Sequence, residues 1–199
     1  YNFAAGPAVL PESVLKKAQS ELLSYHGCGM SVMELSHRGS EFADIHAAAK
    51  ERFKRLLGVP DTHEVLFMQG GATAQFAAVP LNLMGGGSAS YAVTGNFSGI
   101  AAKEAAKYGA VSTAYDGSGD NFRHIPRQEE LDIAPGSAYF HYCANNTIFG
   151  TAWDYVPETG GIPIVCDMSS EIMSHPVDVS KYGVIYAGAQ KNIAPAGLT

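Results

Sequence analysis

The pattern of apolar and polar residues predicts two long helices in the first sixty residues. The first begins at Glu12, directly after Pro11, and is expected to reach about Tyr25. The second begins at Ser40 and ends at 58–60, where the sequence reads Gly-Val-Pro. Its apolar residues lie three or four positions apart and predict one apolar face: Phe42, Ile45, Ala49, Phe53 and Leu56. Charged residues fill most of the other positions, as is typical of a surface helix.

From residue 64 onward the pattern changes to short apolar runs that alternate with helical segments. The runs predict six strands, at 64–68, 90–94, 110–115, 137–142, 162–167 and 183–187. Helices are expected at 73–84 and 99–108, and the Asp-, Gly-, Asn- and Pro-containing stretch 116–136 is expected to be a loop. Several runs are continuously apolar, which suits strands buried on both faces. We therefore predict an α/β fold in which a mostly parallel sheet carries helices on both faces.

Composition and charge narrow the class of partner. The 199 residues are 46% hydrophobic and 16% charged, a globular mixture. The net charge of -6 argues against nucleic acid or an anionic membrane as partner, because neither is attracted to an acidic surface. No run of about 18 apolar residues predicts a membrane span, and the N-terminal YNFAAGP lacks the pattern of a secretory signal. The widely spaced Cys28, Cys143 and Cys166 form no CxxC pair, so we expect reduced thiols in a cytoplasmic protein and no metal site.

Candidate chemistry gathers where the predicted strands end, the edge at which open α/β sheets bind ligands. Residues 69–73 (QGGAT) join a strand to a helix and could cradle a phosphate, although an ordinary glycine-rich turn has the same sequence. Asp167 closes the strand 162–167 and could bind a metal, a ribose or a protonated ring nitrogen, or only cap a turn. Lys191 lies among Ala, Gly and Pro, and such surroundings lower the pKa of an amine and make it nucleophilic. A single lysine is more often solvated or ion-paired.

A phosphate cradle, a strand-end carboxylate and a strand-end lysine, in this order, match the needs of pyridoxal 5'-phosphate. This cofactor requires a phosphate anchor, an acid beside its pyridine nitrogen and a lysine amine. Phe97 follows the strand 90–94, where its ring could stack on the cofactor or belong to the core. Arg38, within Ser-His-Arg-Gly at 36–39, could hold a carboxylate through two parallel hydrogen bonds or form a surface salt bridge.

Longer stretches resemble the phosphoserine aminotransferase family, one of the class V, fold-type I aminotransferases. They span nearly the whole chain: NFAAGPAVLP, SVMELSHRGSEF, GGATAQFAAVPLNL, HYCANNTIFGT and SKYGVIYAGAQKNIAPAGLT. The resemblance implies that Lys191 is the Schiff-base lysine and that Asp167 pairs with the pyridine nitrogen. It also implies that the backbone of Ala72 and Thr73 and the side chain of Gln190 hold the phosphate.

The same resemblance implies that Thr147 lies near the ring hydroxyl of the cofactor. It implies that Arg38, with His37 beside it, binds the α-carboxylate of the amino-acid substrate. Phe97 departs from the family pattern, which usually has tryptophan stacked on the ring. Phenylalanine still stacks, with less area and without an indole N–H.

The activity implied by the resemblance is transfer of the amino group of L-glutamate to 3-phosphohydroxypyruvate, which gives phosphoserine and 2-oxoglutarate in serine biosynthesis. Family members are longer chains that form homodimers. We therefore expect residues 1–14 to be an N-terminal arm and 15–199 to be an incomplete PLP-binding large domain, with the small domain missing and the chain alone inactive. Two alternatives stay open: a class V transaminase of the serine–pyruvate or alanine–glyoxylate type, and a non-catalytic fragment.

Overall fold

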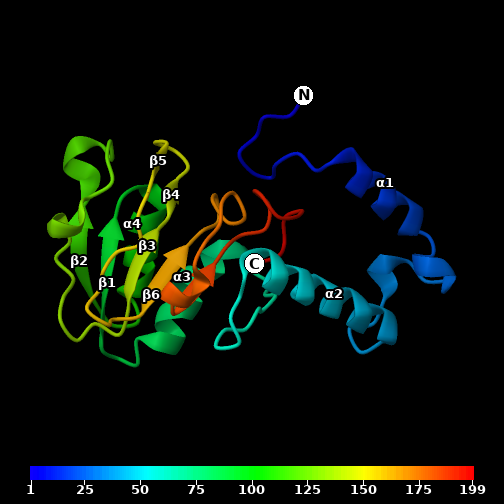
Figure 1. The fold of residues 1–199 in the computed structure, drawn as a ribbon, viewed down its shortest axis with the longest axis horizontal. Helices are drawn as coiled ribbons and strands as arrows, with labels where there is room; N and C mark the ends of the chain where they lie inside the picture. Colours follow the sequence, from blue (N-terminus) through cyan, green and yellow to red (C-terminus); the bar gives the residue numbers. More distant parts are fainter.

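One parallel sheet forms the centre of the computed structural model, which describes all of residues 1–199 (Figure 1). Its five strands, given in sequence order, are β1 (Ser88–Val93), β2 (Ala110–Asp116), β3 (Phe140–Cys143), β6 (Ile164–Asp167) and β7 (Val184–Tyr186). Their spatial order is β2-β1-β3-β6-β7, and every neighbouring pair is parallel. The predicted α/β class with a mostly parallel sheet is confirmed.

The direction in which strands are added reverses between β1 and β3. From β1 the chain passes through α4 (Asn96–Ala105) to β2 on one side, and it then returns to the other side of β1 as β3. In open α/β sheets such a reversal leaves a crevice at the carboxyl ends of the two strands concerned. The sheet therefore marks the ends of β1 and β3 as the place to look for a ligand site.

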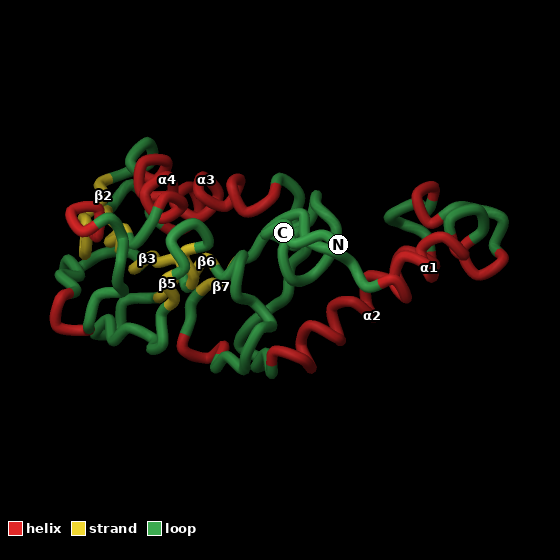
Figure 2. Tube along the Cα trace, turned by 90° about the horizontal axis from the view of Figure 1, so that it is seen from above, coloured by secondary structure: helices red, strands yellow, loops and turns green.

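Two helices, α3 (Gly71–Leu83) and α4, cover one face of the sheet (Figure 2). They bury Phe76 and Val79 of α3 and Ala101 and Ala105 of α4 against the strands. The sheet residues of this cluster come from β1, β6, β7 and the position before β3: Ala89, Tyr91, Val165, Tyr186 and Tyr139. Because both faces of the sheet are covered, β3 and β6 are buried at every position, which explains their continuous apolar runs.

The opposite face is covered mostly by loops and short 3₁₀ turns. Half of the twelve residues in its buried cluster are aromatic or sulfur-containing: Phe140, Tyr142, Trp153, Cys166, Met168 and Tyr182. Loop residues such as Ile125, Leu131 and Val156 pack over them, and Leu57 brings the end of α2 (Ser40–Leu57) to the same cluster. Helices therefore contact both faces of the sheet. One face is covered by α3 and α4, and among the α-helices only the end of α2 contacts the other.

The strand predicted at 64–68 is wrong, because that segment has no ladder of backbone hydrogen bonds along its length. Only Met68 is paired, through two reciprocal backbone hydrogen bonds with Thr199 of 2.8 and 2.9 Å. A strand requires a partner at successive residues, and no neighbouring strand lies there in the chain. An apolar run alone therefore did not suffice to predict the strand.

The first helix, α1 (Glu12–Glu21), is shorter than the predicted 12–25. It ends early because Ser24 is extended, and its hydroxyl accepts the backbone N–H of Gly29 at 2.9 Å. The backbone N–H of Tyr25 also donates to Met30 at 2.7 Å. Serine thus competes with the helix for hydrogen bonds. The other predicted strands and helices are present, with ends that move by three residues at most.

The N-terminal part of the chain extends away from the sheet (Figure 1). Neither α1 nor α2 contains a buried residue. The apolar face predicted for α2 is present, and its Phe53 contacts Phe67 edge-on at 5.6 Å between ring centroids. Ahead of α1, the first residues turn back to the sheet body, where the N–H of Ala8 donates to the carbonyl of Gln190 at 2.8 Å. The N-terminal segment therefore touches the lysine loop, 187–194, although α1 itself projects outward.

Candidate active site

Asp167 is the last residue of β6 and is only 7% exposed. Its Oδ1 accepts two hydrogen bonds from Ser169, one from the backbone N–H at 2.9 Å and one from the hydroxyl at 2.6 Å. The thiol of Cys143 approaches Oδ2 at 3.9 Å from the neighbouring strand. Burial raises the pKa of the carboxyl, while the Ser169 hydrogen bonds and the charge of Lys191 act in the opposite direction. Asp167 is thus a buried acid at the ligand edge of the sheet.

Lys191 lies in the turn after β7 and is half-buried. Its Nζ donates to the hydroxyl of Thr147 at 2.9 Å and lies 5.5 Å from the ring centroid of Phe97. Burial lowers the pKa of the Lys191 amine, and the charge of Asp167 partly opposes that shift. This direction is the one expected from the small apolar neighbours of the lysine. A larger fraction of this amine is neutral, and so nucleophilic, than in a solvated lysine.

Thr147 is carried by a short hairpin that the sequence did not predict. Its strands, β4 (Asn145–Asn146) and β5 (Thr151–Ala152), pair antiparallel. The amide of Asn146 donates to the carbonyl of Thr94 at 2.8 Å, which ties the hairpin to the end of β1. A Cβ at Gly95 would lie 2.6 Å from the Asn146 side chain, so the close approach needs glycine. Two-residue strands have no periodic pattern that a sequence could reveal.

Phe97 is the second residue of α4 and follows the carboxyl end of β1. Its ring is 41% exposed, and Lys191 Nζ lies over it. A phenylalanine of the core would be covered, so the alternative of a core residue does not hold. Asp167, Lys191, Thr147 and Phe97 therefore meet at the edge of β1, β3, β6 and β7, where the strand order reverses.

Ala72 and Thr73 lie in the first turn of α3. Gly70 precedes the helix with φ 95°, and a Cβ there would lie 2.6 Å from the Ala74 methyl group, so the turn needs glycine. The N–H groups of a helix's first turn have no partner within the helix and carry partial positive charge. Met68 pairs with Thr199, and Leu198 accepts the N–H of Ala189 at 2.9 Å. The segment that enters α3 is therefore hydrogen-bonded to Thr199, and the adjacent Leu198 is hydrogen-bonded to Ala189 of the lysine loop.

Gln190 precedes the lysine, and its side chain folds back over Gly188. A Cβ at Gly188 would come within 2.7 Å of Gln190 Oε1. The carbonyl of Gln190 accepts the N–H of Ala8, and a Cβ at Gly6 would lie 3.0 Å from Lys191 Cγ. Residues 6–8 therefore pack against the stem of Lys191, a contact that no pattern in the sequence predicts.

Arg38 and His37 are not brought to Lys191. Both are exposed in the turn before α2, where the N–H of Arg38 donates to Ser36 Oγ at 3.2 Å. The 18 residues of α2 span about 27 Å, and the helix begins at its end remote from the sheet (Figure 1). Within one chain, these two residues and the lysine do not form one site.

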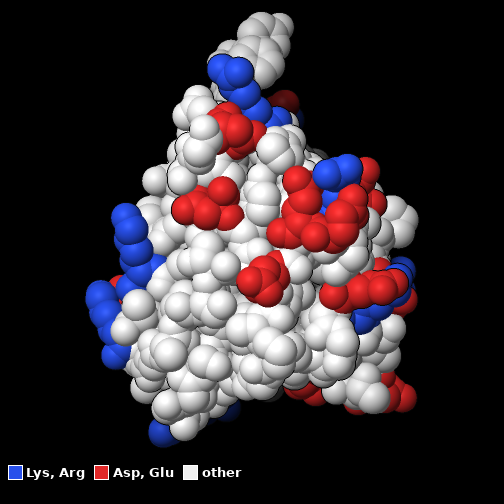
Figure 3. Space-filling view, turned by 90° about the vertical axis from the view of Figure 1, so that its left-hand side faces the viewer, with Lys and Arg blue, Asp and Glu red and all other residues white.

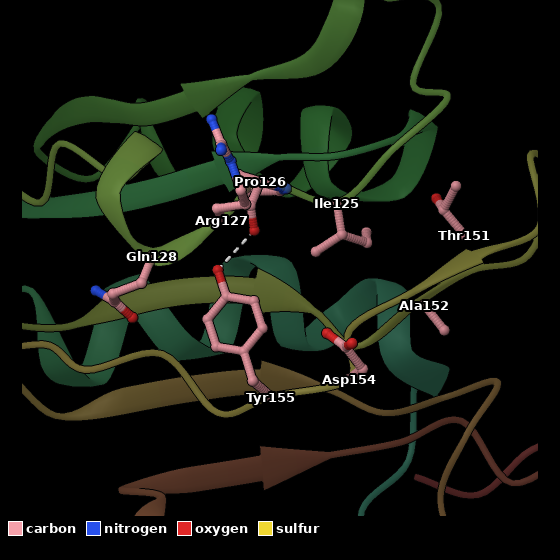
Figure 4. A pocket seen from close by; sticks show the side chains of 8 residues that line it. All are labelled: Ile125, Pro126, Arg127, Gln128, Thr151, Ala152, Asp154 and Tyr155. Atoms are coloured by element: carbon pink, nitrogen blue, oxygen red, sulfur yellow. Dashed lines mark hydrogen bonds between the residues drawn. The ribbon is translucent and has the colours of Figure 1, made fainter.

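Two hollows on the surface of the chain lie apart from this constellation. One, of about 560 Å³, lies between the loop at 125–128 and β5 (Figure 4). The Tyr155 hydroxyl donates to the Pro126 carbonyl across it at 2.6 Å. Another, of about 670 Å³, lies over the aromatic face that includes Tyr142 and Trp153. None of the predicted site residues lines either hollow.

Ser169 and Cys143 contact the acid directly, yet the sequence did not identify them. Ser169 lies two residues after Asp167, the spacing at which an aspartate oxygen commonly accepts from its own chain, so this signal was available. Cys143 has no such signal, because its place opposite Asp167 depends on the register of β3 against β6.

Comparison with known proteins shows the family of the chain. Residues 1–199 match the family model Aminotransferase class-V, and the chain belongs to that family. Phosphoserine aminotransferase of Laribacter hongkongensis is 54% identical over the whole chain and 55% of its own length. The structure of phosphoserine aminotransferase from Bacillus circulans subsp. alkalophilus aligns with a TM-score of 0.96 at 43% identity, over 100% of this chain and 55% of that one. A PLP-bound phosphoserine aminotransferase from Trichomonas vaginalis aligns with a TM-score of 0.93 at 36% identity, over 100% of this chain and 56% of that one. The chain thus spans about half the length of the relatives it matches.

Proposed function

We propose that this chain is the cofactor-binding part of a pyridoxal-phosphate-dependent phosphoserine aminotransferase. The observation that carries the proposal is the meeting of Asp167, Lys191, Thr147 and Phe97 at one edge of a parallel sheet. The relatives with that name, at 43% and 54% identity over the whole chain, support the same activity.

The residues present fit the cofactor. The Oδ2 atom of the buried Asp167 has only a thiol at 3.9 Å as partner, so it lacks a strong hydrogen-bond donor that a protonated ring nitrogen would supply. Phe97 offers an exposed ring face, and Thr147 offers a hydroxyl beside Lys191. The first turn of α3, at Ala72 and Thr73, would hold the phosphate through backbone N–H groups, with Gln190 beside it.

Each side chain then has a definite role. Bound pyridoxal phosphate would supply an electron sink for the α-carbon of an amino acid. Asp167 would keep a proton on the ring nitrogen through the attraction between its carboxylate and that nitrogen. Lys191 Nζ would hold the cofactor covalently and, once released, would accept the proton from the α-carbon and return it. Thr147 would orient the lysine amine.

The proposed reaction transfers the amino group of L-glutamate to 3-phosphohydroxypyruvate, giving phosphoserine and 2-oxoglutarate. Arg38 and His37 would bind the α-carboxylate of the amino acid. These two residues lie far from Lys191 within one chain. Their role therefore requires that a second chain brings its Arg38 and His37 to this lysine, and we propose a homodimer. Its support is the number of large apolar residues exposed on α1 and α2: Val14, Leu15, Phe42 and Leu56.

We further propose that residues 1–14 serve as an arm over the lysine loop and that 15–199 form most of the large domain of a cytoplasmic enzyme. The contact between Ala8 and Gln190 supports the first part. None of the helices is both long enough and apolar enough to cross a membrane.

Because the substrate site needs groups from beyond this chain, the test loads the assembled enzyme with pyridoxal phosphate and supplies L-glutamate with 3-phosphohydroxypyruvate. We expect a visible absorbance band and phosphoserine as product. The Lys191→Ala variant should lose the covalent band and the turnover together. A band with turnover of pyruvate or glyoxylate, but not of 3-phosphohydroxypyruvate, would favour the serine–pyruvate or alanine–glyoxylate alternative. A protein without a band would be a non-catalytic fragment.

A further inference from the structure

The two oxygens of the buried Asp167 carboxylate have unequal partners. Oδ1 accepts both hydrogen bonds from Ser169, at 2.6 Å from the hydroxyl and 2.9 Å from the backbone N–H. Oδ2 has only the Cys143 thiol at 3.9 Å, and sulfur is a weak donor. One oxygen is therefore occupied by strong donors, and the other is left for a partner that the chain does not supply.

Ser169 also connects the acid to the lysine loop. Its hydroxyl proton goes to Asp167 Oδ1, so its oxygen is free to accept, and it accepts the N–H of Gly188 at 3.0 Å. Gly188 lies three residues before Lys191 in the same turn. Ser169 is itself buried, so these hydrogen bonds do not compete with bulk water. The hydroxyl therefore fixes the carboxylate relative to the backbone that carries the lysine.

Cys143 is suited to leave Oδ2 available. It lies directly opposite Asp167 in the β3–β6 register and is buried. Burial and the nearby carboxylate raise the pKa of the thiol well above its ordinary value, so it stays protonated. A neutral S–H neither repels the carboxylate nor holds it strongly.

We propose that Ser169 is a positioning residue for the ring-nitrogen contact of the cofactor: its hydroxyl holds Oδ1 of Asp167, links it to Gly188 and so presents Oδ2 to the ring nitrogen. This inference rests on the proposed binding of pyridoxal phosphate. A neutral apolar residue at 169 would leave Oδ1 with one hydrogen bond instead of two and would free the carboxylate to rotate.

The test uses protein loaded with pyridoxal phosphate that carries ¹⁵N in its ring, because the ¹⁵N chemical shift distinguishes a protonated ring nitrogen from a neutral one. In Ser169→Ala we expect the ring nitrogen to lose its proton at a pH about one unit lower than in the parent, since an ionised Asp167 is less well stabilised. We expect kcat to fall about tenfold or more while the KM for glutamate stays within about twofold.

Ser170→Ala is the matched control. Ser170 is the next residue. Its hydroxyl accepts from the Asn145 side-chain amide at 2.8 Å and donates to the Asn145 carbonyl at 3.3 Å, so the variant loses hydrogen bonds that do not involve Asp167. Its ring-nitrogen titration should equal that of the parent. Ser169→Cys keeps the shape with a weaker donor, so it should show a smaller shift in the same direction, and it serves if Ser169→Ala does not fold.

The outcomes separate this inference from the proposed function. If the parent binds no pyridoxal phosphate, the proposed function fails and the inference fails with it. If the parent binds the cofactor but the folded Ser169 variants titrate as the parent does, the role of Ser169 is wrong while the proposed function stands. A shift in the Ser169 variants without one in Ser170→Ala supports the proposal.

Discussion

At the scale of single residues, burial and mutual attraction act against each other in Asp167 and Lys191. Burial raises the pKa of the acid and lowers that of the amine, because both charged forms lose hydration. Each charge stabilises the other and reduces both shifts. Without a cofactor, burial has the larger effect on both residues. A ligand that brings a protonated nitrogen to Asp167 would stabilise the ionised acid.

Asp167→Asn tests this balance in the cofactor-free protein. The pKa of Asp167 is higher in the folded chain than in the unfolded chain, so its contribution to stability is complete below the unfolded pKa and is lost as pH rises through the folded pKa. The asparagine variant does not titrate there. It should therefore melt higher than the parent at about pH 8, and the difference should shrink toward about pH 4. Melting curves of both proteins across that range measure it.

In the enzyme with bound cofactor, the same Asp167→Asn substitution should be harmful, because it should lower the turnover rate. A neutral amide cannot keep the ring nitrogen protonated, so we expect turnover to fall by at least about a hundredfold, or roughly 2.7 kcal/mol. Unchanged turnover would mean that Asp167 is only a turn residue.

Gly6→Ala tests the contact between the arm and Lys191. The added Cβ would lie 3.0 Å from Lys191 Cγ, so the lysine stem must move by a few tenths of an ångström. We expect pyridoxal phosphate to bind about threefold to tenfold more weakly, with little change in melting temperature. Gly119→Ala is the control, because a Cβ there meets no atom within 4 Å. Equal cofactor affinity in the two variants would show that the arm does not constrain the lysine.

At the scale of elements, the site depends on how the strand ends are tied together. Asn146 joins the β4–β5 hairpin to β1, and Ser169 joins β6 to the loop after β7. The hairpin then holds Thr147 at the lysine amine. These are hydrogen bonds between a side chain and the backbone, so they hold the strand ends in place without adding strands to the sheet.

Gly95→Ala should break the tie between β1 and the hairpin. Its Cβ would lie 2.6 Å from the buried Asn146 side chain, and overpacking of this kind costs about 1–3 kcal/mol. We expect a lower melting temperature and weaker cofactor binding. The double variant Gly95→Ala, Asn146→Ala lacks the Asn146 side chain that the new Cβ would meet. The stability that this double variant loses should therefore be less than the sum of the losses in the two single variants. Additive losses would contradict the steric explanation.

The sequence predicts most of the strands and helices, but it does not predict the side-chain hydrogen bonds that connect the strand ends. Apolar runs identify β1, β3, β6 and β7. The runs are most continuous where the strands are covered on both faces, as in β3 and β6, which are buried at every position. The run at 64–68 has the same composition but lacks a neighbouring strand. Asp167 and Lys191 could be predicted because Asp167 ends one apolar run and Lys191 lies in the loop that follows another. Cys143 could not, because its role depends on the strand register.

At the scale of the whole molecule, the acidic net charge fits the proposed small-molecule substrates, and the exposed apolar residues fit the proposed homodimer. Figure 3 shows one face with Asp and Glu over its middle and Lys and Arg mainly toward its rim, in keeping with the net charge of -6. The N-terminal helices expose apolar residues away from the sheet, and Arg38 lies at the remote end of α2. The proposed substrate clamp is therefore the part of the site that needs the assembled protein.

Arg38→Lys tests that clamp in the assembled protein. Lysine keeps the charge but loses the two-pronged geometry, so the KM for both glutamate and phosphoserine should rise about tenfold or more. The cofactor band should survive. Since Arg38 has no ion-pair partner in the chain, the melting temperature should not change. Unchanged kinetics with a lower melting temperature would assign Arg38 to the scaffold.

The central claim, that Lys191 carries pyridoxal phosphate beside Asp167, is tested most directly by locating the cofactor. The loaded protein is reduced with borohydride to make the bond permanent, then digested, and its peptides are analysed by mass spectrometry. The geometry predicts a pyridoxyl group on Lys191 and on no other lysine. A label on a different lysine, or none on any, would contradict the account.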